Sequence, residues 1–296
     1  MQARFILGDI NSSTGQESLI MAIKGHAIHF ISGLPRSGST LLSAILRQNP
    51  HFSAGMSGPT ATLLGAVLPK MSGASEYAPF FTDERRHRVL RNLFEAYHHD
   101  ELASGKLVFD TNRTWTAKLP LLNSLFPDAR VICCVRDVPW VIDSIEKMIR
   151  RNPTHVSSIF HGKDTRNVYG RVKDVMDSER GLIGLPWGSL REAWFGEHAK
   201  KLIVVRYESL VTDPANIING IYEQLGLEPF PHDFENVKYQ EEQFDQRLGM
   251  PDLHTVKRKV ELEKRATILP PDIFMKYADM NFWDNDKLNT KRVFVL

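Results

Sequence analysis

A loop rich in glycine and hydroxyl groups, between residues 33 and 40, is the part of this sequence best suited to chemistry. It reads Gly-Leu-Pro-Arg-Ser-Gly-Ser-Thr, with Gly33, Gly38 and Thr40 at the P-loop spacing G-x-x-x-x-G-x-[ST]. Backbone N–H groups of such a loop, and those that open the following helix, bind anionic oxygens. Arg36 adds a guanidinium that can hold two oxygens at once. The loop therefore predicts a site for a phosphate-like anion rather than an ordinary turn.

Ser39 stands where a nucleotide-hydrolysing P-loop has its lysine. That lysine neutralises the β- and γ-phosphates of a triphosphate, whereas this loop offers N–H groups, hydroxyls and Arg36. The pattern therefore favours a nucleotide with a shorter anionic end, such as a phosphosulfate. A P-loop kinase or NTPase that binds ATP and Mg²⁺ is the alternative, and a catalytically silent nucleotide-binding module is a third hypothesis.

A second arginine and a second hydroxyl follow an apolar strand further along the chain. The β-branched run that starts at Arg130 ends at Arg136, and a helix that begins near Pro139 carries Ser144. Arg136 supplies a permanent charge with two donors, and Ser144 supplies a hydroxyl. These groups together are suited to holding a phosphate.

Both motifs resemble those of sulfotransferases that use 3′-phosphoadenosine 5′-phosphosulfate (PAPS). The resemblance implies a P-loop-like sulfotransferase fold and transfer of a sulfuryl group to an acceptor hydroxyl or amine, with no metal. A third passage, residues 202–227, is also similar to the family: a strand, Tyr-Glu-x-Leu, Asp-Pro, a helix and Leu-Gly-Leu. It implies that Tyr207 lies near the adenine, and the basic segment 253–259 offers Lys257 as a further contact. The implied cofactor-binding residues are Pro35, Arg36, Ser37, Gly38, Ser39, Thr40, Arg136, Ser144, Tyr207 and Lys257.

The catalytic base that many relatives use has no counterpart here. Residues 54–59, shortly after the loop, contain no carboxylate, and the strand end at residues 109–113 lacks the histidine of small-molecule enzymes. Asp110 lies at that strand end and could accept the proton of the acceptor, although helix capping or a bond to the loop backbone is its alternative role. Arg113 could stabilise charge on the transferring sulfonate. The catalytic candidates are therefore Arg36, Asp110 and Arg113.

Apolar strands alternate with amphipathic helices along the chain, which predicts an α/β fold: a parallel sheet flanked by helices on both faces. Strands near residues 29, 107, 131 and 202 each end in a polar cluster. Because ligands of open α/β sheets bind beyond the carboxyl ends of the strands, four clusters at one edge predict a single nucleotide site. Helices are expected at 83–99 and 116–126, and a loop-rich stretch is expected at 53–79.

Composition sets bounds on class and partners. The chain has 296 residues, 42% of them hydrophobic, and a formal net charge of +2. We expect one α/β domain over residues 1–296, with an irregular acceptor-side lobe at about 150–200 and a C-terminal extension from about 228. The small net charge argues against nucleic acid as a partner. Cys133 and Cys134 are adjacent on one strand and point to opposite faces, so they are predicted to be small core residues rather than a disulfide.

The acceptor itself cannot be identified from these patterns. No uninterrupted apolar run of membrane length and no signal peptide is visible, so a cytoplasmic enzyme is expected. The acceptor could be a small molecule, a carbohydrate or a peptide, and a homodimer is left open. Because residues 153–188 follow the helix of Ser144, they are expected to form the lid over the acceptor.

Overall fold

A six-stranded sheet lies at the centre of the computed structural model, which describes residues 28–73, 75–151, 159–161, 165–247, 254–256, 259–261 and 265–296. The strand order is β2-β3-β1-β4-β5-β6, and every neighbouring pair is parallel. The strands are β1 (Ile28–Gly33), β2 (Phe52–Ala54), β3 (Leu107–Thr111), β4 (Val131–Val135), β5 (Leu202–Arg206) and β6 (Phe294–Val295). The predicted parallel α/β sheet is confirmed.

Side chains of the central strands alternate between two hydrophobic layers, as the period of a strand requires. Phe30 and Cys133 belong to one layer, and Ile31 and Cys134 belong to the other. Both cysteines are fully buried and neither forms a disulfide, which confirms their expected role as core residues.

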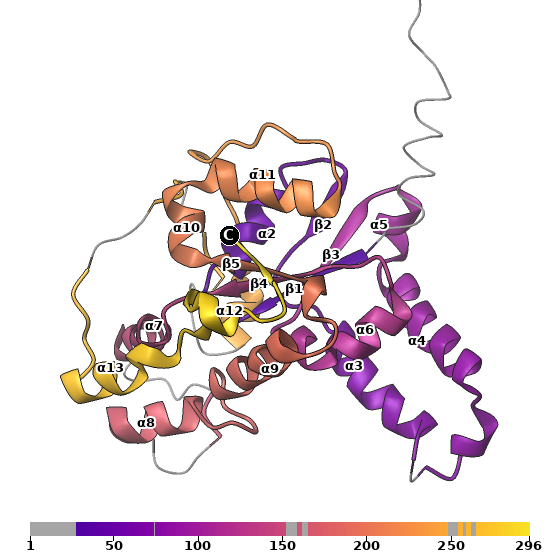
Figure 1. The fold of residues 1–296 in the computed structure, drawn as a ribbon, viewed down its shortest axis with the longest axis horizontal. Coiled ribbons are helices and arrows are strands. Elements are labelled where there is room, and N and C mark those ends of the chain that lie inside the picture. Colours follow the sequence, from indigo (N-terminus) through magenta and orange to yellow (C-terminus); the bar gives the residue numbers. More distant parts are fainter. Residues whose placement is uncertain are drawn as a thin grey trace, which may run out of the picture.

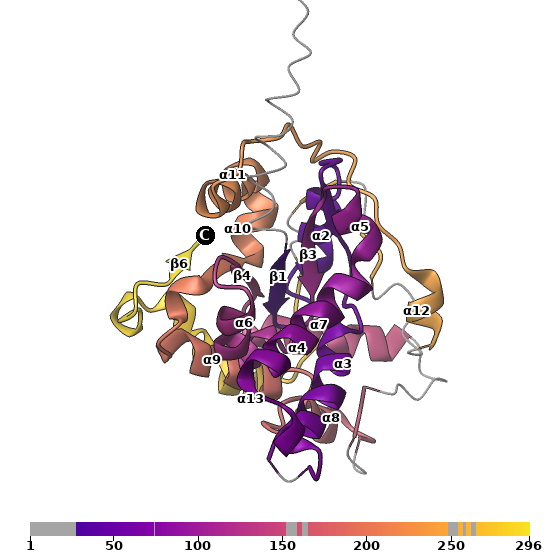
Figure 2. The same cartoon turned by 90° about the vertical axis from the view of Figure 1, so that its right-hand side faces the viewer.

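Helices cover both faces of the sheet, and the two views show them in separate layers (Figures 1 and 2). One layer holds α2 (Ser39–Leu46), α10 (Tyr207–Thr212) and α11 (Pro214–Leu225). The other holds α3 (Thr60–Val67), α4 (Asp83–Tyr97), α6 (Leu119–Leu125), α7 (Val138–Arg151), α8 (Val168–Val175), α9 (Gly184–Phe195) and α13 (Pro271–Tyr277). Shorter helices are α5 (His99–Ala103) and α12 (Glu242–Arg247), with 3₁₀ turns at 68–71, 78–80, 115–118, 199–201, 278–280, 282–284 and 286–288. No described helix is long and apolar enough to cross a membrane.

The strand order places β1 between β3 and β4, so the chain leaves β1 for one edge of the sheet and later crosses to the other. Such a reversal opens a crevice at the carboxyl ends of the strands. The loops after β1, β3, β4 and β5 all leave from this edge, because the strands are parallel. The polar clusters predicted from the sequence therefore share one side of the sheet.

Several boundaries differ from expectation where an element is short or lacks capping residues. The stretch 53–79, expected as loop, contains the end of β2 and all of α3, whose first turn has no side-chain cap. The expected helix 116–126 begins as a 3₁₀ turn at Trp115–Lys118. The lobe at 150–200 contains α8 and α9, and the extension from 228 returns to the sheet as β6. Strands of two or three residues are too short to show a period of two, so the sequence pattern missed β2 and β6.

Candidate functional site

The loop between β1 and α2 adopts backbone conformations that its residue types explain. Gly33 has φ 122°, and a Cβ there would lie 2.0 Å from the Cys134 carbonyl oxygen, so only glycine allows β1 to reach β4. Arg36 has φ 58°, a left-handed conformation that is unfavourable for a residue with a side chain. Ser37 is buried, and its hydroxyl lies 2.8 Å from the Cys134 carbonyl oxygen, so this side chain shapes the loop.

Helix α2 begins directly at the end of this loop. Gly38 occupies the position before its first turn with φ 93°, and no side chain caps that turn. The first N–H groups of a helix have no partner within the helix and carry a partial positive charge. Ser39 and Thr40 lie in this first turn and are partly exposed. The helix start therefore offers donors for an anion.

Arg36 joins the loop to helix α7. Its Nε donates a hydrogen bond to Ser144 Oγ over 3.2 Å. Its carbonyl oxygen accepts a hydrogen bond of 3.4 Å from Nη1 of Arg136, which follows β4. The sequence analysis placed Arg36 and Ser144 in two separate anion-binding motifs, whereas the structure places the two side chains in direct contact. The two arginines and the serine form a single cluster.

Arg136 lies over an aromatic ring and beside a carboxylate. Its guanidinium carbon is 4.2 Å from the centre of the Tyr207 ring, and its Nε is 3.7 Å from Glu208 Oε1. That Nε is buried and donates no hydrogen bond to any described residue. Burial lowers the pKa of Arg136, an effect that Tyr207 and Glu208 partly oppose. A buried donor of this kind is a feature expected of a binding site.

Two neighbouring cations in a partly buried site favour the binding of an anion between or beside them. Burial lowers the pKa of Arg36, and the charge of Arg136 lowers it further. The Tyr207 ring borders the same site. It packs close to Gly38, where an added Cβ would lie 3.0 Å from the ring. The structure thus places four predicted residues together beside the start of α2: Arg36, Arg136, Ser144 and Tyr207.

Buried acidic residues fix the helix that carries Ser144. Asp143 accepts hydrogen bonds from Thr267 Oγ1 (2.8 Å) and the Ile268 N–H (2.7 Å), and it pairs with Arg265. Glu146, which lies three residues further along the helix, pairs with Arg171, with 2.6 Å between its Oε1 and Nη2 of the arginine. Sequence reasoning missed both acids. Their signal was present, however, because carboxylates on the apolar side of a helix must find partners when they are buried.

Asn281 fixes the start of the same helix. The Val138 N–H donates to its Oδ1 over 3.2 Å, and its Nδ2 donates to Asp137. This side chain comes from the C-terminal part of the chain, and no local pattern around residue 137 predicts it.

Asp110 does not contact the arginine cluster. Its side chain is 1% exposed, and its Oδ2 lies 2.6 Å from Thr60 Oγ1 and 2.7 Å from His98 Nε2. Trp115 Nε1 donates to Oδ1 over 3.1 Å. Both carboxylate oxygens are therefore engaged by side chains from other segments, which differs both from an accessible base and from the bonding to the loop backbone raised as its alternative. Burial of the strand end explains the difference.

Arg113 lies at the same strand end with a different environment. Its guanidinium has no hydrogen bond or ion pair with a described residue, and burial lowers its pKa. Its carbonyl oxygen accepts from Ser32 Oγ over 3.1 Å, which fixes its backbone beside β1. Arg113 thus keeps its candidate role. Lys257 lies outside the described residues.

The sheet order, the glycine loop and the clustered arginines define an α/β protein with a P-loop-like fold and a candidate anion site. A family model described as "Sulfotransferase family" matches residues 29–232, and the chain belongs to that family. The matched region contains the loop, Arg136, Ser144 and Tyr207. No curated protein sequence is significantly similar to this chain.

The chain is similar to several solved structures of sulfotransferases. The sulfotransferase domain of the curacin biosynthetic pathway is 15% identical, with 90% of this chain and 89% of that chain covered and a TM-score of 0.48. A sulfotransferase from Alicyclobacillus acidocaldarius is 15% identical, with 75% and 89% covered and a TM-score of 0.47. Sulfotransferase STF9 from Mycobacterium avium is 14% identical, with 72% and 67% covered and a TM-score of 0.40. These similarities are too remote to assign an acceptor.

Proposed function

We propose that this protein transfers a sulfuryl group from PAPS to a hydroxyl or amine of an acceptor. One observation carries the proposal: Arg36, Arg136 and Ser144 meet beside Tyr207 and the uncapped start of α2. Membership of the sulfotransferase family supports sulfuryl transfer in general. The arrangement of charges supports a doubly anionic nucleotide as its donor.

The residues present fit such a nucleotide. The buried Arg136 Nε lacks a hydrogen-bond acceptor among the described residues, and a phosphate oxygen would supply one. The start of α2, with Ser39 and Thr40, offers N–H and hydroxyl donors for the 5′ end. We assign Arg136 and Ser144 to the 3′-phosphate, and Tyr207 to the adenine. When bound, PAPS supplies the activated sulfuryl group, with adenosine 3′,5′-bisphosphate as the leaving group.

Arg36 and Arg113 are the cations proposed to stabilise negative charge on the sulfuryl oxygens. Ser144 orients the Arg36 side chain through its hydrogen bond, so the serine both positions this arginine and offers its hydroxyl to the 3′-phosphate. Arg113 brings a guanidinium that has no partner among the described residues, from the adjacent strand end. Fixed donors of this kind stabilise developing charge without having to reorganise during the reaction. Asp110 is a poor candidate for the base, since both of its oxygens accept hydrogen bonds inside the protein.

Calorimetry with two nucleotides tests the proposal. Adenosine 3′,5′-bisphosphate is expected to bind, whereas ATP with Mg²⁺ is expected to bind far more weakly, because the loop lacks the lysine of a triphosphate site. The reverse order would favour a P-loop kinase or NTPase. Transfer of ³⁵S from labelled PAPS to a panel of phenols, sugars and peptides then tests the reaction itself, and EDTA is expected to leave that transfer intact.

Three expectations from the sequence stay predictions: the cytoplasmic location, a homodimer and the contact of Lys257 with the nucleotide. A Lys257→Ala variant tests the last of these by the same calorimetry. A loss of bisphosphate affinity would support the contact, and an unchanged affinity would count against it.

A further inference from the structure

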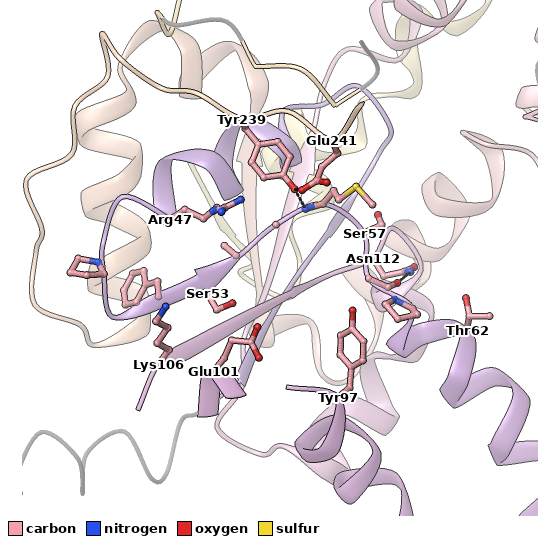
Figure 3. Close-up of a pocket in the computed structure, with 17 residues that line it drawn as sticks. Arg47, Ser53, Ser57, Thr62, Tyr97, Glu101, Lys106, Asn112, Tyr239 and Glu241 are labelled. Carbon is pink, nitrogen blue, oxygen red and sulfur yellow. Dashed lines mark hydrogen bonds between the residues drawn. The ribbon is translucent and has the colours of Figure 1, made fainter. Parts of the chain in front are cut away.

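A groove of about 910 Å³ runs along the free edge of the sheet, where β2 is the last strand (Figure 3). Its floor is the chain from Phe52 to Pro59, which is β2 and the segment that follows it. Figure 3 shows side chains on both sides of this floor. One wall contains Arg47, Tyr239 and Glu241, and the other contains Tyr97, Glu101 and Lys106.

The backbone of β2 presents unused hydrogen-bonding groups to this groove. The His51 carbonyl accepts from the Leu107 N–H over 2.9 Å, so residue 51 faces β3. In a parallel strand, alternate residues bond to the same neighbour, which turns Phe52, Ala54 and Met56 toward the free edge. Neither the N–H nor the carbonyl of Ala54 bonds to another described residue.

The outward N–H groups on both sides of Ala54 are already partnered. The Phe52 N–H donates to the Asn49 carbonyl over 3.0 Å. The Met56 N–H donates to the Tyr239 hydroxyl over 2.8 Å, and that hydroxyl also donates to Glu241 Oε1 over 3.0 Å. The Tyr239 hydroxyl thus accepts the hydrogen bond that the Met56 N–H could otherwise donate to a neighbouring strand. The edge that is open for pairing is centred on Ala54, which suits a short extended segment.

The groove leads from the amino end of β2 to the proposed transfer site. It is lined by Lys106 at one end and by Ser57 and Asn112 at the other. Residues 106–112 of an extended strand span about 20 Å. The Asn112 N–H donates to the Ile31 carbonyl over 2.9 Å, and Arg113 is the next residue. A chain that lies in the groove would therefore reach the carboxyl edge beside β1 and Arg113.

The charges along the walls favour a peptide over an acidic glycan. Arg47 and Lys106 are basic, whereas Glu101 and Glu241 are acidic, and each wall carries both signs. A uniformly anionic chain would meet two carboxylates, whereas a peptide can place side chains of either sign opposite each wall. Exposed edge strands with open backbone groups bind extended peptides by adding a strand.

We propose that this groove binds an extended peptide segment that pairs with Ala54 of β2, and that this segment carries the acceptor hydroxyl. The inference rests on the proposed function, because it names the acceptor class for that reaction. The inference places acceptor recognition at the β2 edge, whereas the sequence analysis expected it at residues 153–188.

A degenerate peptide library tests the groove. Each peptide holds one central tyrosine or serine between four random residues on either side, and a mixture of oligosaccharides and p-nitrophenol are offered in parallel with labelled PAPS. We expect the peptides to be labelled. In Ala54→Pro, which removes an outward N–H without removing a bond to β3, labelling should fall by about tenfold or more while bisphosphate affinity is unchanged.

Charge reversal provides a second variant that does not depend on the folding of Ala54→Pro. Lys106→Glu should shift the labelled peptides from acidic to basic flanking residues, whereas Lys200→Glu, on the exposed turn before β5, should not. Unchanged flanking preferences in Lys106→Glu would overturn the inference, as would unchanged labelling in a folded Ala54→Pro.

The outcomes separate this inference from the proposed function. A wild-type protein that fails to bind the bisphosphate removes the proposed function and the groove assignment with it. A protein that binds the bisphosphate but labels only oligosaccharides, only p-nitrophenol or no acceptor at all overturns the peptide groove alone.

Discussion

The loops after β1 and β3 leave the same edge of the sheet from neighbouring strands, yet they use their polar residues differently. After β3, the Asp110 carboxylate is buried, and three side chains satisfy it. After β1, Arg36 sits in a left-handed conformation beside Arg136, a second cation whose Nε lacks a hydrogen bond to the described residues. The Asp110 carboxylate is satisfied within the protein, whereas the buried Arg136 Nε has no hydrogen-bond partner among the described residues.

This contrast separates structural from functional polar groups. Both loops follow buried apolar strands, so their position in the sheet does not show which of them binds a ligand. Satisfied hydrogen bonds stabilise a fold, whereas backbone strain and an unsatisfied buried donor cost free energy and persist where a ligand uses them. Substitutions in the two loops should therefore have opposite consequences for stability and activity.

The largest effect is expected for Asp110→Ala. It leaves His98 and Trp115 without their buried acceptor, and the loss of one partner from such a network costs about 3–5 kcal/mol of unfolding free energy. Urea denaturation measures the loss, with Asp128→Ala on the exposed turn before β4 as the control. Unchanged stability together with abolished sulfate transfer would instead make Asp110 the base.

Arg36→Gly should show the reverse pattern. Glycine accepts the left-handed backbone and removes a repelled charge, so the free energy of unfolding should stay level or rise by about 1 kcal/mol. Sulfate transfer should fall on the order of 10²–10³-fold, as for the loss of one fixed donor at a transition state. Arg292 is the matched control, since it has φ 56° and is exposed. Arg292→Gly should change stability similarly and leave transfer intact, and retained transfer in Arg36→Gly would remove Arg36 from the mechanism.

Arg136→Ala sharpens the comparison on the binding side. It removes the charged contact assigned to the 3′-phosphate, so affinity for adenosine 3′,5′-bisphosphate should weaken by about 1.5–3 kcal/mol in calorimetry. Arg130→Ala, at the opposite end of the same strand, should bind as the wild type does. Wild-type affinity in Arg136→Ala would refute the assignment of the 3′-phosphate.

The smallest effect is expected for Glu208→Gln. Glu208 competes with a bound anion for Arg136, and half of its side chain is exposed, so screening limits its influence. Removal of its charge should tighten bisphosphate binding by about 0.5 kcal/mol. Glu223→Gln, on the exposed side of α11, is the control. Weaker binding in Glu208→Gln would show that the carboxylate helps to hold the nucleotide.

The sequence predicted the centre of the fold better than its periphery. Apolar runs that end in polar clusters located β1, β3, β4 and β5 because buried parallel strands leave that pattern. β2 and β6 were missed because they contain three and two residues and are held by their neighbours rather than by their own pattern. Helix α3 was missed because it begins without a capping side chain.

The candidate site, like the fold, could be predicted from the sequence only in part. Motif spacing was sufficient to select Arg36, Arg136, Ser144 and Tyr207. It could not show that Arg36 contacts Ser144, because that contact joins residues 108 positions apart. The partners that bury Asp110 come from three separate segments, so no window of sequence around this residue distinguishes a buried carboxylate from a base.

The anchoring of α7 has a consequence for synthesis. Asp143 takes its hydrogen bonds from a segment that begins 122 residues later, and Asn281 secures the start of the helix from still further along. At ordinary translation speeds the ribosome needs roughly 6 to 24 s to make those 122 residues. A nascent chain whose loop and central strands have already emerged would therefore still lack the support that sets Ser144 against Arg36, and the proposed nucleotide site would form only after residues 265–281 have been made.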